Sequence, residues 1–272
     1  MMQQDVGQRK DEIDDSKLSA ALSQQMIAFL APLLVRLDAY LDKRLVRTFV
    51  RTLDPMLIFR QRPGGLLLSE LGAFITSPAH APAGTKRLGN LIRSPRWSAS
   101  LLDAYHWHLA QQRQTELEAA GEASLVIWDT NELEKAESRQ LEGLCAVRSL
   151  KAARLTRHRP GFTQPPLGHK RVFVPSCHWL SLMVSGMSGP PTLAAMRWWT
   201  SRGPLASDMR TEEGALVEDC RRLWVRRVRH VFDRGFAGNP WLTRLRQADV
   251  RFVLRSPGRY HLLDAQGRDR PA

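Results

Sequence analysis

Hydrophobic periodicity changes near residue 121, and no other feature of the sequence constrains the fold as strongly. Before this point, apolar residues recur at steps of three and four, as in Leu30, Leu33 and Leu37, which is typical of one buried helix face. After it, residues 125–128 form a continuous apolar run, typical of a short strand buried on both faces. The sequence therefore predicts a helical region followed by a region built around a sheet.

Capping and helix-breaking residues divide the helical region. In chain order we expect a disordered lead (1–15), a helix capped by Ser16 and beginning at Lys17, a break at 63–65, a short helix beginning near Leu66, a Pro/Ala loop (77–84), a basic helical stretch (86–95) and a longer helix (98–118). Residues 16–120 are predicted to form a domain of their own, with DNA binding as its expected role.

Strand signals recur in the second region, and helical segments separate the last of them. The expected strands are 125–128, 143–147, 178–185, 229–232 and 250–254, and the expected helices are 212–227 and 240–247. Strands that come first and then alternate with helices indicate an α/β fold with a mixed sheet over residues 121–272.

The charge balance indicates a polyanionic partner. There are 40 Lys and Arg against 27 Asp and Glu, which gives a net charge of +13. Binding to phosphates releases condensed counterions and is favoured by such a surplus. The segment 148–171 has seven basic residues and no acidic one, and a second Arg cluster covers 221–229. For the second cluster, a solvated helix face is an equally good interpretation.

Other classes of protein have little support. The three cysteines lie far apart without a Cys-x-x-Cys spacing, which fits a reducing compartment. The N-terminus lacks the pattern of a signal peptide, and no apolar run is long enough to span a bilayer. Phosphate-binding-loop, nucleophile-elbow and dinucleotide motifs are absent from the sequence. We expect a cytoplasmic protein without a membrane partner.

Two aspartates end short apolar runs and are the candidate catalytic residues. Asp129 follows Leu-Val-Ile-Trp, and Asp233 follows His-Val-Phe. Sites in open α/β sheets lie at the carboxyl ends of strands, so carboxylates on adjacent strands can share divalent ions. Mg²⁺ prefers carboxylate oxygens, and two such ions can catalyse phosphodiester displacement. A turn or helix-capping role is the alternative explanation for each Asp taken alone.

The residues around both aspartates carry a resemblance. The first block is 126–130, Val-Ile-Trp-Asp-Thr, with Glu134 and Lys135 downstream. The second is 230–236, His-Val-Phe-Asp-Arg-Gly-Phe, followed by Pro-Trp-Leu at 240–242. Over about residues 124–258, this pattern resembles the DDE transposases of bacterial insertion sequences, in the subclass whose ribonuclease-H-like core is interrupted by a β-rich insertion.

The resemblance implies a function and its cofactor. Asp129 would be the first metal ligand and Asp233 the second, holding two Mg²⁺ ions for which Mn²⁺ can substitute. The partners would be double-stranded DNA, both element ends and target, and a second copy of the chain in a homodimer, at the nucleoid in the bacterial cytoplasm. The expected phosphate-binding residues are Arg148, Lys151, Arg154, Arg157, Arg159, Arg226, Arg227 and Arg234.

The third carboxylate of the family is not found in this sequence. The family has a Glu on a later helix, within a Tyr, Arg, Glu, Lys pattern, and no Glu follows Asp233 here. We therefore expect a partial ribonuclease-H-like core with impaired strand cleavage and transfer, truncated at its C-terminus. Two alternatives stay open: an inactive DNA-binding fragment that inhibits transposition, and a ribonuclease-H-like nuclease.

Overall fold

A computed structural model describes residues 15–62, 66–135, 138, 143–149, 172–256, 261–263 and 266–271. Residues 1–14 of the predicted lead, the break at 63–65 and most of the basic segment 148–171 lie outside the described residues. The first helix begins at Asp15, so the expected cap at Ser16 is wrong. The chain divides into two compact units, Met1–Leu102 and Asp103–Ala272. The division falls before residue 121 because the helix Ala99–Ala119 contributes Ala110 and Leu117 to the core of the second unit.

The first unit is helical, as the periodicity predicts. Its elements are α1 (Asp15–Tyr40), α2 (Lys43–Ile58), α3 (Leu68–Ile75), the short 3₁₀ helix η1 (Pro78–His80) and α4 (Ala81–Ile92). The expected Pro/Ala loop at 77–84 is wrong, because η1 and the first turn of α4 occupy most of it. Proline is tolerated in a first helical turn, where its missing N–H would have no partner in any case.

Leucines at helical spacing form the core of this unit. Leu33 and Leu37 of α1 are buried, as are Leu71 of α3 and Leu88 of α4. The helices α3 and α4 also approach each other through paired glycines. A Cβ atom on Gly84 would overlap the backbone of Gly72, so this contact requires glycine.

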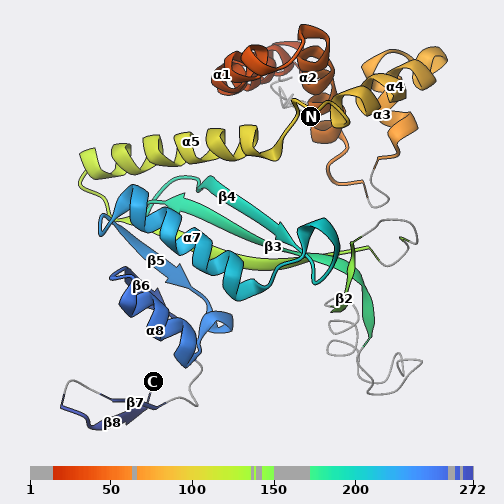
Figure 1. Cartoon of the computed structure of the whole chain (residues 1–272). Helices are drawn as coiled ribbons and strands as arrows, with labels where there is room; N and C mark the ends of the chain where they lie inside the picture. Colours follow the sequence, from red (N-terminus) through yellow and green to blue (C-terminus); the bar gives the residue numbers. More distant parts are fainter. Residues whose placement is uncertain are drawn as a thin grey trace, which may run out of the picture. The chain divides into compact units, whose positions relative to one another are not determined.

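The second unit is a mixed α/β structure (Figure 1). Its elements are α5 (Ala99–Ala119), β1 (Ser124–Glu134), β2 (Cys145–Arg148), β3 (Phe173–Ser185), β4 (Thr192–Trp199), η2 (Gly203–Leu205), α7 (Met209–Trp224), β5 (Val228–Phe232), η3 (Arg234–Phe236), α8 (Asn239–Gln247) and β6 (Arg251–Leu254). A separate antiparallel pair joins β7 (His261–Leu263) to β8 (Asp269–Pro271).

The main sheet combines antiparallel and parallel pairing. Its strand order is β2-β3-β1-β5-β6, and β4 also pairs with β3. The pairs β1–β3, β2–β3 and β3–β4 are antiparallel, whereas β1–β5 and β5–β6 are parallel. The predicted α/β class with a mixed sheet is confirmed at this level.

Helices α5 and α7 contact the same face of the sheet. Arg197 of β4 lies 3.1 Å from Asp219 of α7 and 3.9 Å from Asp103 of α5. Figure 1 shows α7 crossing the strands. Beneath the helices, buried side chains from alternate strand positions, such as Val126 and Leu182, form the core. In the part of the chain that the structure describes, no helix is both long and apolar enough to cross a membrane.

Candidate active site

Parallel pairing of β1 with β5 ends shortly before the two candidate aspartates. The paired rows run from Ser124 opposite Val228 to Ile127 opposite Val231. Asp129 lies two positions beyond Ile127 and is still within β1, whereas Asp233 lies two positions beyond Val231 and is the cap residue of η3, just after β5 ends. Neighbouring strands lie about 4.8 Å apart, and both aspartates are exposed. The two aspartates that the sequence singled out therefore come just after the last paired positions of two adjacent strands.

The strand that carries Asp129 is longer than expected. We expected Asp129 to end its strand, but β1 continues to Glu134 and pairs with β3 as far as Ser176. Only its pairing with β5 stops at Ile127. Burial also changes at this point, since Trp128 is buried and Asp129 is exposed. Asp129 thus lies where the buried part of the strand gives way to an antiparallel extension.

A hydrogen bond in the core links the two strands just before the aspartates. The indole N–H of Trp128 donates to Nδ1 of His230, 2.9 Å away. His230 is 1% exposed, and burial lowers the pKa of its imidazole to about 4. The ring is therefore neutral near pH 7, and its Nδ1 is free to accept. Trp128 also packs on Phe232, with ring centroids 5.2 Å apart.

Two polar residues beside Asp129 escaped the sequence prediction. The Asn131 side-chain amide donates to Oδ2 of Asp129 at 2.7 Å. Ser181 of β3 stands opposite Asp129, and its hydroxyl donates to the Asp129 carbonyl oxygen at 3.3 Å. Asn131 shares a strand face with Asp129 because side chains alternate, a signal present in the sequence. Nothing in the sequence indicates Ser181, since its position depends on the pairing of distant segments.

Asp233 has a structural role as well as an exposed carboxylate. It caps η3, and its Oδ1 accepts the backbone N–H of Gly235 at 2.8 Å. The capping role that the sequence left open as an alternative is therefore present. A cap uses one carboxylate oxygen and fixes the orientation of the side chain. The other oxygen has no hydrogen-bond donor among the described residues.

The donor atoms here suit a hard divalent cation in an open site. Mg²⁺ binds through one or two carboxylates and keeps waters or substrate phosphates as its other ligands. For an ion bound here, Asp129 and Asp233 would supply the two carboxylates. Among the residues that the structure describes, no group of three or more His, Cys, Asp or Glu could hold a metal. The residues present fit a weak, water-rich site and do not enclose an ion.

The expected phosphate-binding residues do not all lie near the aspartates. Arg234 follows Asp233 directly and is exposed. Arg226 and Arg227 come before β5, at the end of this five-residue strand that is opposite to Asp233. Phosphate binding by these two residues stays a prediction. Arg226 lies 3.2 Å from Asp249, and Arg227 lies 3.7 Å from Glu118.

The first basic cluster is only partly described. Arg148 is the last residue of β2 and is exposed. The remaining predicted members, Lys151, Arg154, Arg157 and Arg159, lie outside the described residues. DNA binding by this cluster stays a prediction.

Comparison with known proteins adds little to this site. No family model matches the sequence, and no curated protein matches it. Among solved structures, the chain is similar to "Mos1 transposase paired-end complex with left transposon end", with 8% sequence identity and a TM-score of 0.24. The alignment covers 74% of this chain and 57% of that chain, so this chain spans less than two thirds of the matched length. Similarity this weak does not establish a shared fold.

Proposed function

We propose that this protein binds duplex DNA and belongs to the metal-dependent DNA transposases with a ribonuclease-H-like core. The observation that carries the proposal is the parallel β1–β5 pairing, because the two exposed aspartates each lie two positions beyond its last pair, Ile127 opposite Val231. The mixed sheet supports it, because antiparallel strands come first and parallel strands joined by helices follow.

Each residue of the site has a distinct role in this proposal. Asp129 and Asp233 would hold Mg²⁺, which when bound polarises a phosphodiester and activates the attacking oxygen. Asn131 orients the carboxylate of Asp129, and the η3 cap orients that of Asp233. Arg234 follows Asp233 in the sequence, and its guanidinium can donate to a phosphate oxygen of the bound DNA strand.

A second candidate function is DNA binding without cleavage. The observation that favours it is the absence, among the described residues, of a third carboxylate grouped with Asp129 and Asp233. In-line attack requires the reacting groups to be held in a defined geometry, which two carboxylates secure less well than three. A chain of this kind would occupy element ends and inhibit transposition.

Metal binding by the two aspartates is the first testable prediction. Millimolar Mg²⁺ or Mn²⁺ should raise the melting temperature of the wild-type chain, because a ligand that binds only the folded state stabilises it. Asp129→Asn and Asp233→Asn should each abolish this shift, since an amide cannot replace the carboxylate charge. Thermal unfolding with and without the metal measures the effect.

Asp249→Asn is the matched control for this experiment. Asp249 is exposed and precedes β6, at the opposite end of the sheet from the aspartates. It has a φ of 52°, a conformation that asparagine adopts readily. The metal shift should persist in this variant. A wild-type chain that folds and shows no metal-dependent shift would disprove the proposed site.

Nicking of supercoiled plasmid separates the two candidate functions. Cleavage that needs Mg²⁺ or Mn²⁺ and falls at least about 100-fold in both aspartate variants supports the transposase. Duplex binding without nicking by the wild-type chain supports the inhibitory binder.

A further inference from the structure

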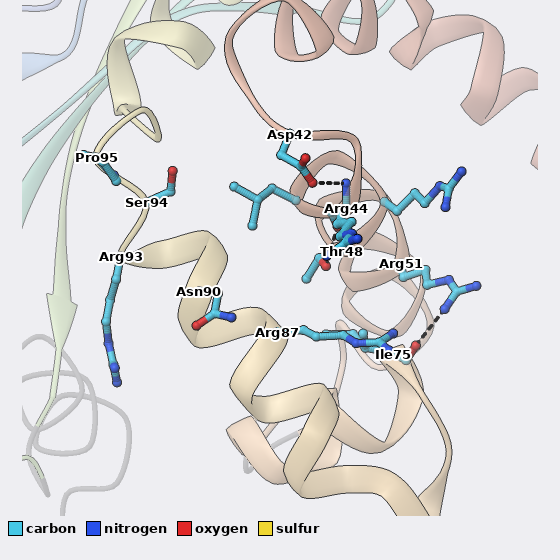
Figure 2. A pocket seen from close by; sticks show the side chains of 12 residues that line it. Asp42, Arg44, Thr48, Arg51, Ile75, Arg87, Asn90, Arg93, Ser94 and Pro95 are labelled. Carbon is cyan, nitrogen blue, oxygen red and sulfur yellow. Dashed lines mark hydrogen bonds between the residues drawn. The ribbon is translucent and has the colours of Figure 1, made fainter.

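A basic groove runs between α2 and α4 in the helical unit (Figure 2). Its volume is about 930 Å³. The lining residues come from the first half of α2, the end of α3 and the last turns of α4 with the residues after it. They are Asp42, Arg44, Leu45, Arg47, Thr48, Arg51, Ile75, Arg87, Asn90, Arg93, Ser94 and Pro95.

Positive charge in the groove is largely uncompensated. Five arginines line it, against a single aspartate. That aspartate, Asp42, caps α2 and accepts the backbone N–H of Arg44 at 2.8 Å. No carboxylate of the described residues lies within ion-pair distance of the five guanidinium groups. Like charges gathered on a concave surface repel one another, and a bound anion relieves this repulsion.

Arginines face the groove from both of its walls. Figure 2 shows Arg44 and Arg51 on α2 and Arg87 reaching from α4 toward α2, whereas the side chain of Arg93 points away from α2. Arg51 is held in place because its guanidinium donates to the Ile75 carbonyl at 3.1 Å. This hydrogen bond ties α2 to the end of α3 and holds the Arg51 guanidinium at the groove.

The chemistry of the lining selects the phosphate backbone of a nucleic acid. A guanidinium group presents paired N–H donors that match two phosphate oxygens. The side-chain amide of Asn90 is exposed in the groove and can donate to a further oxygen. None of the lining residues is aromatic, so the groove has no platform on which unpaired bases could stack.

We infer that the groove between α2 and α4 binds the sugar–phosphate backbone of duplex DNA through Arg44, Arg47, Arg51, Arg87 and Arg93. The choice of duplex DNA among polyanions rests on the proposed function. The groove makes contacts that do not depend on base sequence, and it lies in a different unit from the two aspartates.

A double variant with a matched control tests the groove. Arg47→Gln with Arg87→Gln removes one exposed charge from each wall. Arg60→Gln with Lys86→Gln removes two exposed charges of the same unit that do not line the groove. Binding of a fluorescent duplex of mixed sequence is measured by anisotropy, in EDTA and at several salt concentrations. Thermal unfolding checks that both variants are folded.

We expect the groove variant to bind the duplex at least about tenfold more weakly near 100 mM salt. The slope of log K against log salt should become shallower by about 2, since each lost phosphate contact contributes about 0.9. The control variant should change affinity less than about threefold. Equal losses in the two variants would overturn the inference, because the effect would then follow net charge alone.

Two further probes distinguish other anions. Single-stranded DNA that binds more tightly than the duplex would overturn the inference, and so would inorganic phosphate that stabilises the chain as much as the duplex does.

The binding test is also independent of the proposed active site, because the binding buffer contains no metal. Loss of binding in the groove variant together with a failed metal-binding test would leave the groove standing and remove the transposase proposal. Unchanged binding in the groove variant together with a successful metal-binding test would remove only the inference about the groove.

Discussion

At the scale of single residues, the surroundings of His230 determine its protonation state. It is a buried residue of β5, its ring stacks on that of Phe232, and it accepts the indole N–H of Trp128. Protonation would place a charge in an apolar environment and would also remove the acceptor at Nδ1. The alignment of β1 with β5 next to the aspartates therefore depends on a neutral imidazole.

This dependence predicts a loss of stability in mild acid. The pKa of His230 is about 4 in the folded chain and about 6.5 in the unfolded chain. As the pH falls, the unfolded state binds the proton first. The stability that neutral His230 contributes is therefore fully present above pH 6.5 and is lost as the pH falls towards 4. We expect the free energy of unfolding to be roughly 2 kcal/mol lower at pH 5 than at pH 7 from this residue.

Denaturant unfolding of wild type and His230→Phe at the two pH values measures the contribution. Burial also lowers the pKa of His106 and His178, so the wild type loses some stability through them as well. His230→Phe should retain the smaller loss of stability due to His106 and His178 and should lack the loss due to His230. An identical pH dependence in both chains would show that His230 does not control acid stability.

At the scale of elements, the glycine contact between α3 and α4 sets how closely these helices pack. Gly84→Ala should destabilise the helical unit by about 1–3 kcal/mol, because the new methyl group would meet the Gly72 backbone. Gly89→Ala in the same helix is the control, since its Cβ would meet only the end of the Arg93 side chain, 4.0 Å away. That control should be neutral or stabilising by up to about 1 kcal/mol. Denaturant unfolding compares the two, and equal effects would contradict the close packing.

Elements with a clear period could be predicted from the sequence, and elements without one could not. Residues 98–118 and 240–247 show helical spacing, and both form helices, α5 and α8. The strand β4 was not predicted, because Thr192–Trp199 lacks alternation and its strand conformation comes from pairing with β3. The same limit applies to the ends of β1 and β3, which extend well beyond their apolar segments.

At the scale of the whole molecule, net charge predicts how DNA binding responds to salt. A chain of charge +13 that contacts about five phosphates should lose roughly 500-fold in affinity between 50 and 200 mM salt, almost independently of DNA sequence. Anisotropy titrations on two unrelated duplexes measure this dependence. An affinity that varies little with salt would exclude backbone contacts as the main source of binding.

Much of the candidate site could be predicted because its key residues follow apolar runs. Asp129 and Asp233 were identified in this way, and β1 and β5 are neighbours in one sheet. The positions of Arg226 and Arg227 could not be predicted, since a run of charges does not reveal which end of a strand it precedes in space. The groove in the helical unit was also missed, because its five arginines come from segments about 40 positions apart.

The helix Ala99–Ala119 has a practical consequence for anyone who wishes to produce the sheet unit separately. Its residues Ala110 and Leu117 are buried among core side chains of the sheet unit. A shortened gene that starts at codon 121 would remove this cover and leave hydrophobic surface in contact with solvent, which favours aggregation during expression. A start codon placed before residue 99 would preserve the cover and should yield soluble material.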